Sequence, residues 1–264
     1  MHLPYAKQPI KAIFLDVDGT LISFITHRVP QSAVDAVSRA HDNGVKIVIA
    51  TGRASTDLDV LSAIPYDAVA ALNGTDCIMR DGSVVARHLI PVDQFSKALE
   101  LSRTYGFVMA IENNDGILVN RLTPEVCDFM RYVDHPVPPV VDLEAVFAQG
   151  NCCQLCFFCN TETQALVMPQ LPALAASRWH PFFADINVKG IDKATAIDDF
   201  ARYFQIDVSQ TMAIGDGGND APMILRAGIG VAMGNASDQV KAIADYVTAD
   251  VDSDGLAVAL RHFL

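Results

Sequence analysis

The sequence is poor in positive charge. It has 19 Lys and Arg residues against 31 Asp and Glu residues, a formal net charge of −12 at pH 7. No run of basic residues offsets this balance locally, so the composition argues against nucleic-acid binding and against docking on an anionic membrane. Binding of an anionic small molecule would therefore require a local cluster of positively charged groups.

Long apolar runs are also missing. No uncharged apolar stretch approaches the roughly 18 residues of a membrane-spanning helix, and the N-terminus lacks the pattern of a signal peptide. The chain has only six cysteines in 264 residues, and four of them are bunched together, unlike a secreted disulfide framework. We therefore expect a soluble cytoplasmic protein without a membrane partner. Its oligomeric state stays open, and a monomer is compatible with the sequence.

The sequence does contain short apolar runs, each closed by small or polar residues. These runs are Ala12–Leu15, Val45–Ala50, Val69–Leu72 and Met212–Ile214. Such runs suit parallel strands that are buried on both faces. Helical apolar spacing lies between them, from Ser32 to Gly44, from Lys193 to Phe204 and from about Asn219 to Ala227. The alternation predicts an α/β fold, a Rossmann-like parallel sheet with helices on both faces.

The middle of the chain has a different pattern of predicted strands and helices. Strand-like pieces at Phe107–Glu112, Gly116–Asn120 and Leu155–Cys159 alternate with helix-like stretches near Gln94–Tyr105 and Pro124–Val133. This pattern predicts an inserted α+β domain over residues 83–185. Residues 1–82 and 186–264 would together form the core domain.

Polar residues follow the candidate strands of this core. They include Asp16 and Asp18 after the first run, Thr51 after the second, and Asp216 after the last. In open parallel sheets, ligands bind beyond the carboxyl ends of the strands, so these residues should share one rim. The carboxylates of Asp16 and Asp18 are two residues apart, so they repel each other and are costly to bury. We therefore expect a cation or hydrogen-bond donors to bind them.

Four short motifs carry a resemblance over the whole chain. They are Asp16-Val17-Asp18-Gly19-Thr20, then Thr51-Gly52-Arg53, then Lys193, and finally Gly215-Asp216-Gly217-Gly218-Asn219-Asp220. In order and spacing they resemble the motifs of the haloacid dehalogenase-like phosphatases. The insertion is similar to the C2B cap of the Cof-type subfamily, which is expected to close over the organic part of the substrate.

The resemblance implies a phosphatase that hydrolyses small phosphorylated metabolites through an aspartyl-phosphate. Sugar phosphates are the leading substrate class, with pyridoxal phosphate or a nucleotide as others. Asp16 is the candidate nucleophile, and Asp18 is the candidate general acid and base.

The implied ligands are oxygen-rich. Asp16, the backbone carbonyl of Asp18, and Asp216 would hold Mg²⁺, with Asp220 one layer further out. The phosphate would be held by the Thr51 hydroxyl, the Gly52 amide, Lys193 and Asn219.

Some assignments remain open in the sequence. Lys189 lies near Lys193, and Ala194 stands where the family commonly has glycine, so either lysine is a candidate, with Lys193 preferred. Glu112, Asn114 and Asp115 are candidate contacts for sugar hydroxyls, although the same residues suit an exposed turn.

A cysteine motif offers a competing interpretation. Cys152-x-x-x-Cys156-x-x-Cys159 matches the pattern with which radical S-adenosylmethionine enzymes hold an iron–sulfur cluster. However, the surrounding run reads as a buried strand, which would point Cys156 and Cys159 to opposite faces and prevent chelation. Buried structural cysteines are the preferred interpretation. A phosphomutase with the same phosphoaspartate chemistry and a non-catalytic phosphate or Mg²⁺ sensor are also compatible with the motifs.

Overall fold

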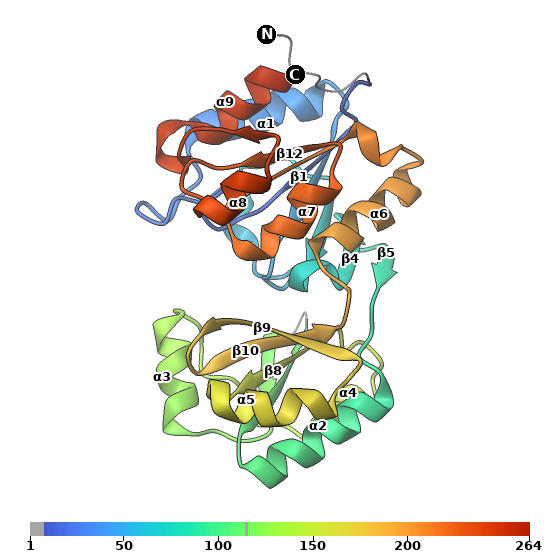
Figure 1. The fold of residues 1–264 in the computed structure, drawn as a ribbon, viewed down its shortest axis with the longest axis vertical. Helices are drawn as coiled ribbons and strands as arrows, with labels where there is room; N and C mark the ends of the chain where they lie inside the picture. Colours follow the sequence, from blue (N-terminus) through green and yellow to red (C-terminus); the bar gives the residue numbers. More distant parts are fainter. Residues whose placement is uncertain (1–7, 114–115) are drawn as a thin grey trace. The chain divides into compact units, whose positions relative to one another are not determined.

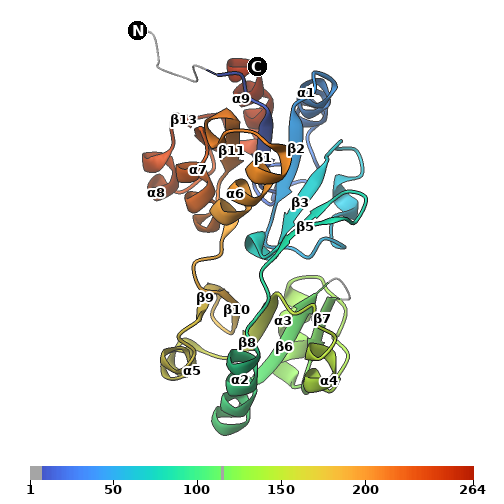
Figure 2. The same cartoon turned by 90° about the vertical axis from the view of Figure 1, so that its right-hand side faces the viewer.

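The computed structural model describes residues 8–113 and 116–264. The chain forms two compact units (Figures 1 and 2). The first unit comprises the chain up to Ala86 together with Asp192–Leu264, and the second unit is Arg87–Ile191. The second unit is therefore an insertion in the sequence of the first.

The first unit is built on an eight-stranded sheet with the order β13-β12-β11-β1-β2-β3-β4-β5. The strands are β1 Ala12–Leu15, β2 Lys46–Ala50, β3 Ala68–Ala71, β4 Asp76–Met79, β5 Val84–Arg87, β11 Thr211–Gly215, β12 Ile229–Ala232 and β13 Tyr246–Val247. From β13 to β3 neighbouring strands are parallel, whereas β4 is antiparallel to β3. All four residues of β1 are fully buried, as expected for a central parallel strand between two layers of helices.

Helices cover both faces of this sheet. They are α1 Gln31–Asp42, α6 Lys193–Phe204, α7 Ala221–Arg226, α8 Asp238–Ile243 and α9 Gly255–Phe263. On one face, α6 packs Ala196, Ile197 and Phe200 against the apolar side chains of the central strands. On the other face, α1 lies beside α9 (Figure 1). The predicted Rossmann-like α/β fold is thereby confirmed.

The second unit is built on a five-stranded antiparallel sheet with the order β7-β6-β8-β10-β9. Its strands are β6 Val108–Asn113, β7 Gly116–Val119, β8 Gln154–Phe158, β9 Leu174–His180 and β10 Phe183–Val188. Its helices are α2 Val92–Tyr105, α3 Pro124–Tyr132, α4 Leu143–Phe147 and α5 Thr161–Val167. Side chains of α2 and α5 pack on one face of the sheet and those of α3 on the other. The insertion therefore has the predicted α+β architecture.

Several predicted elements differ from the observed ones by a residue or two at their ends, and two of them bear on the site and on the cysteine motif. The helix expected from about Asn219 begins as a 3-10 turn at Gly218–Asp220, and the α-helix proper is α7. Here the Asp220 carboxylate accepts backbone N–H bonds from Asp216 and Gly217, so a side chain shapes this turn. The strand expected to include Cys159 ends at Phe158.

Among the described residues, no helix is long and apolar enough to cross a membrane.

Candidate active site

The site begins where β1 ends. The Asp16 amide still donates to the Ile214 carbonyl of β11, at 3.0 Å, so Asp16 continues the strand by one residue. The chain then turns at Gly19, whose φ is +85°. A Cβ at Gly19 would overlap with the Asp216 carboxylate, so glycine is needed both for the turn and for this close approach. The loops after β1 and β11 are thus brought into contact.

Lys193 lies at the centre of this group. It is the first residue of α6, its side chain is fully buried, and its Nζ lies 2.6 Å from Asp16 Oδ1 and 2.6 Å from Asp220 Oδ1. Lys189 is exposed and belongs to the second unit. Of the two candidate lysines, Lys193 is therefore the one beside Asp16.

Asp220 has both carboxylate oxygens engaged by protein donors. Oδ1 contacts Lys193, while Oδ2 accepts the Asp216 and Gly217 amides at 2.9 and 2.8 Å. It therefore positions the lysine and the loop. Asp16, Asp216 and Asp220 nevertheless each offer an oxygen within 4.8 Å of the others, so this group could hold a metal ion.

The electrostatics of the group favour a further positive charge. Burial, and next the charge of Asp220, raise the pKa of Asp16, and Lys193 opposes this rise. Burial and Asp220 likewise raise the pKa of Asp216 to about 6. Burial disfavours the charged form of Lys193, but Asp16 and Asp220 outweigh it and raise the lysine pKa, so Lys193 stays an ammonium. Three carboxylates thus face one ammonium, and the oxygen donors suit a hard divalent cation.

The loops that carry the predicted phosphate-binding residues meet at Asn73, a residue to which the sequence analysis gave no role. Thr51 is buried, its Oγ1 accepts the Arg53 amide at 3.1 Å, and its carbonyl accepts the Asn73 amide at 2.8 Å. A Cβ at Gly52 would lie 3.4 Å from the Asn73 side chain, which in turn accepts a hydrogen bond from Asn219 Nδ2 at 3.1 Å. The loops carrying Thr51, Gly52 and Asn219 therefore converge on Asn73.

Sequence reasoning missed the partner of Asp18. Arg53 makes a bidentate ion pair with it, from Nε to Oδ2 at 2.9 Å and from Nη2 to Oδ1 at 2.7 Å. The hydrogen bonds to Asp18 raise the pKa of Arg53 above its usual value. The only sequence signal was the position of Arg53 within Thr51-Gly52-Arg53.

A second missed residue is Asn235, which follows β12. Its Nδ2 donates to the Gly19 carbonyl at 2.8 Å and to Asp216 Oδ2 at 3.0 Å. Its Oδ1 accepts the Val251 amide at 3.1 Å, which fixes the orientation of the side-chain amide. Asn235 therefore links the two acidic loops, and no motif marked it in the sequence.

The structure excludes the iron–sulfur interpretation of the cysteine motif. Cys152 and Cys159 pack in the apolar cluster under α2 and α5, whereas Cys156 packs on the opposite face with α3. The prediction that Cys156 and Cys159 face opposite ways is therefore confirmed. Of the three candidate sugar contacts, Glu112 is on β6, and Asn114 and Asp115 lie outside the described residues.

Comparison with known proteins gives likenesses over nearly the whole chain. The sequence model of the haloacid dehalogenase-like hydrolase family matches residues 13–260. The solved structure of BT1666 from Bacteroides thetaiotaomicron, described among phosphatases of the haloalkanoate (HAD) enzyme superfamily, is 55% identical, with a TM-score of 0.92 over 99% of this chain and 98% of that chain.

Two further relatives are more distant. BT4131, described as a HAD subclass IIB sugar phosphatase, is 37% identical, with a TM-score of 0.83 over 96% of this chain and 98% of that chain. The putative phosphatase YkrA of Bacillus subtilis is 29% identical over 255 residues, covering 96% of this chain and 97% of its own length.

Proposed function

This chain belongs to the haloacid dehalogenase-like hydrolase family and is a phosphatase, and from that premise we propose that it hydrolyses sugar phosphates with Mg²⁺ through an aspartyl-phosphate on Asp16. Small phosphorylated metabolites are the wider substrate class. The description of the 37% identical BT4131 as a sugar phosphatase supports the choice of substrate.

One observation carries the proposal. The Asp16 carboxylate ends a fully buried parallel strand and is held at Oδ1 by the buried ammonium of Lys193, beside Asp216 and Asp220. A fixed carboxylate next to a lysine and to oxygen ligands for a cation is what phosphoryl transfer to an aspartate requires, because the transferred group carries several negative charges.

The proposed reaction has two steps. An Asp16 oxygen attacks phosphorus while the bond from phosphorus to the leaving oxygen breaks, and Asp18 gives its proton to that oxygen. Asp18 then takes a proton from a water whose oxygen attacks the phosphorus of the aspartyl-phosphate. Inorganic phosphate leaves, and the Asp16 carboxylate is restored.

The remaining residues bind and orient. Lys193 fixes the rotation of the Asp16 carboxylate and supplies positive charge for a phosphate oxygen. The Thr51 hydroxyl, the Gly52 amide and Asn219 bind the other phosphate oxygens, from loops that meet at Asn73.

The acidic group fits Mg²⁺ by its chemistry. Its donors are all carboxylate oxygens, the ligands that this hard cation prefers. Asp16, Asp216 and the Asp18 carbonyl would hold the ion, and Asp220 would support them from one layer further out. When bound, Mg²⁺ supplies charge neutralisation at the phosphate oxygens.

The test is a panel of phosphorylated metabolites with and without Mg²⁺, on the wild type and Asp16→Asn. We expect Mg²⁺-dependent release of inorganic phosphate, strongest for sugar phosphates, which Asp16→Asn lowers by at least about 10³-fold because the nucleophile is gone. Asp35→Asn, at an exposed acid on α1, is the matched control and should retain activity.

Each further outcome has a fixed meaning. Phosphate release that persists in EDTA or in Asp16→Asn would contradict the mechanism. A phosphate isomer of the substrate in place of inorganic phosphate would identify a phosphomutase. Activity confined to pyridoxal phosphate or nucleotides would overturn the sugar assignment while leaving the chemistry in place.

A further inference from the structure

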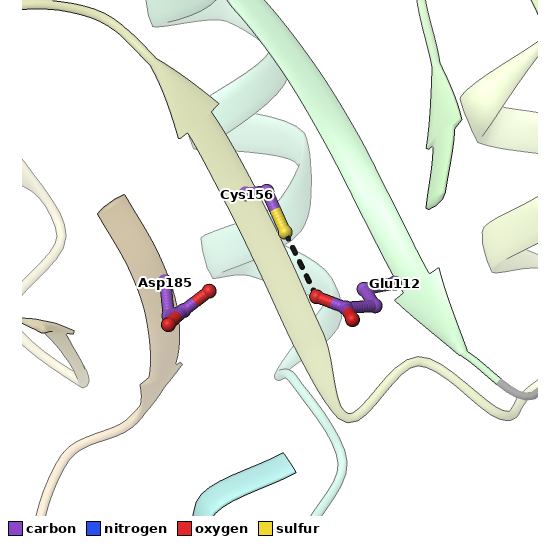
Figure 3. A group of neighbouring side chains, drawn as sticks. All are labelled: Glu112, Cys156 and Asp185. Carbon is purple, nitrogen blue, oxygen red and sulfur yellow. Dashed lines mark hydrogen bonds between the residues drawn. The ribbon is translucent and has the colours of Figure 1, made fainter. Parts of the chain in front are cut away.

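A second group of metal-ligating side chains lies in the second unit and shares no residue with the acidic group of the first unit. Figure 3 shows Glu112, Cys156 and Asp185 turned toward one another from β6, β8 and β10. One ligand atom of each lies within 4.8 Å of the others. We infer that these three side chains form a binding site for a divalent cation of the Zn²⁺ class. This inference does not depend on the proposed function.

The sheet register brings the three ligands together. Cys156 lies directly opposite Asp185 on β10 and opposite Ala110 on β6. Glu112 is two residues beyond Ala110, so it projects from the same face. Because β6, β8 and β10 are adjacent strands of one sheet, the ligands are held by rigid backbone rather than by a loop.

Two of the three side chains are buried, and the third is partly exposed. The Cys156 side chain is fully buried and Asp185 is 8% exposed, whereas Glu112 is partly exposed. On the same face, α3 and its apolar partners cover the part of the sheet around Phe158 and Phe183. The two inner ligands are therefore shielded from water, and an ion has access from the side of Glu112.

The donor set selects the kind of ion. Two carboxylates and one thiol suit Zn²⁺, which takes both oxygen and sulfur ligands, and they do not suit Mg²⁺ or Ca²⁺, which prefer oxygen alone. In a tetrahedral Zn²⁺ site, a bound oxygen and a bound sulfur lie about 3.6 Å apart, as the usual bond lengths require. Glu112 Oε2 and Cys156 Sγ lie 3.3 Å apart, so this pair needs little adjustment.

Two buried amides orient the carboxylates. Gln154 Nε2 donates to Glu112 Oε2 at 2.7 Å and to Asp185 Oδ1 at 3.2 Å. Asn187 Nδ2 donates to Gln154 Oε1 at 2.8 Å, which fixes which way the Gln154 amide points. Hydrogen bonds of this kind hold metal ligands in place and commonly strengthen metal binding about 10–100-fold.

The Cys156 thiol carries a proton that a bound ion must displace. Burial, then the charges of Glu112 and Asp185, raise the pKa of Cys156 well above its usual value, so without an ion Cys156 is a thiol that donates to Glu112. Binding of the cation forms a metal–sulfur bond and releases that proton to solvent.

The experiment uses the full chain with Mg²⁺ in excess, so that the acidic group of the first unit is already filled. Co²⁺ is the probe, because a cobalt–thiolate bond gives a charge-transfer absorption that oxygen ligands do not. We expect one equivalent of Co²⁺ to produce this absorption and one equivalent of Zn²⁺ to remove it. Cys156→Ser should abolish the absorption. Cys159→Ser, from the same segment but the opposite face, should retain it.

Two further variants keep the test decisive if Cys156→Ser does not fold. Asp185→Asn should weaken Zn²⁺ binding, and Gln154→Ala should weaken it about 10–100-fold without removing a ligand. The inference is overturned if the wild type shows no charge-transfer absorption. It is equally overturned if Cys156→Ser binds Zn²⁺ as tightly as the wild type.

Discussion

At the residue scale, the two aspartates that open the site are held in opposite ways. Asp16 is buried and contacts the buried Lys193. The Asp18 side chain is 43% exposed and forms a bidentate ion pair with the guanidinium of Arg53. The first arrangement fixes a carboxylate, as a nucleophile needs. The second leaves the carboxyl group within reach of solvent, as a group that exchanges protons needs.

The first prediction concerns Arg53 as the residue that positions Asp18. Arg53→Lys cannot make the bidentate contact, so Asp18 is less well placed to protonate the leaving oxygen. We expect kcat for a sugar phosphate to fall by roughly 10-fold, less than the about 10²–10⁴-fold that general acid catalysis contributes, because Asp18 itself is still present. The fall should be much smaller for nitrophenyl phosphate, because nitrophenolate leaves without a proton.

The controls for this prediction are direct. Asp18→Asn should show the same dependence on leaving group, and more strongly. Arg39→Lys, at an exposed position on α1, should change neither rate. Equal losses for both substrates in Arg53→Lys would mean that Arg53 does not act through Asp18.

The second prediction concerns Lys193 and pH. Lys193→Met leaves Asp16 and Asp220 buried without their shared cation, which should lower the free energy of unfolding by about 3–5 kcal/mol at neutral pH. Burial and Asp220 already raise the Asp16 pKa, and the opposing effect of Lys193 is lost. A folded-state pKa above the unfolded value gives stability that is present at low pH and lost as pH rises. The variant should therefore be closer to wild type at pH 5 than at pH 8.

Urea unfolding at both pH values measures this effect. Lys46→Met is the matched control, because Lys46 is half exposed in its pair with Asp67 and should contribute no more than about 1 kcal/mol. A Lys193→Met variant that loses more stability at pH 5 than at pH 8 would contradict the electrostatic account.

At the element scale, the start of α6 depends on a glycine in another loop. Gly74 has a φ of +90°, and a Cβ there would lie 2.5 Å from the Asp192 carbonyl, next to Lys193. Asp192 is the N-cap of α6 and accepts the amides of Ala194 and Thr195. The close approach of the Gly74 loop therefore helps to fix where Lys193 begins its helix.

The third prediction follows from this contact. Gly74→Ala should destabilise the protein by more than about 2 kcal/mol, through backbone strain of about 1 kcal/mol plus displacement of the cap. Activity per folded molecule should also fall, because Lys193 moves. Gly44→Ala is the matched control, since its φ is +85° but its Cβ would meet open space. The two variants should differ in thermal unfolding, and equal losses would show that only the backbone conformation matters.

The sequence predicts those strands and helices whose apolar pattern can be recognised without knowing which elements they pair with or pack against. The central strand Ala12–Leu15 was predicted with its observed bounds, because a parallel strand buried on both faces is continuously apolar. The strands β9 and β10 were not predicted, since Asp185 and Asn187 interrupt β10 and polar residues interrupt β9. β9 pairs with β10 directly after it in the chain, and β10 pairs with β8, so their strand character comes from this antiparallel pairing.

The candidate site follows the same division. The motifs marked residues that end strands, and the structure places Asp16, Lys193, Asp216 and Asp220 together. Asn235 was not identified, because its contacts depend on how separate loops meet across the rim. The Glu112–Cys156–Asp185 group was equally hidden, since its members come from three strands and only the register shows that they share a face.

At the scale of the whole molecule, the chain has separate hydrophobic cores in two units. One core lies between α6 and the parallel sheet, and others lie on the two faces of the antiparallel sheet. The two candidate cation sites also fall in different units, one made of carboxylate oxygens and the other including a thiol. Each ion should therefore stabilise the unit that binds it.

The fourth prediction follows from this separation. Calorimetry of the metal-free chain should resolve two unfolding transitions. Mg²⁺ at about 100 times its dissociation constant should stabilise the first unit by about 2.7 kcal/mol and raise its transition by roughly 5–10 °C. Zn²⁺, added after Mg²⁺, should raise the other transition.

Asp216→Asn should lose only the Mg²⁺ shift, and Cys156→Ser should lose only the Zn²⁺ shift. If both ions moved a single transition together, the two units would unfold as one, because a cation that binds one of two independent units cannot stabilise the other.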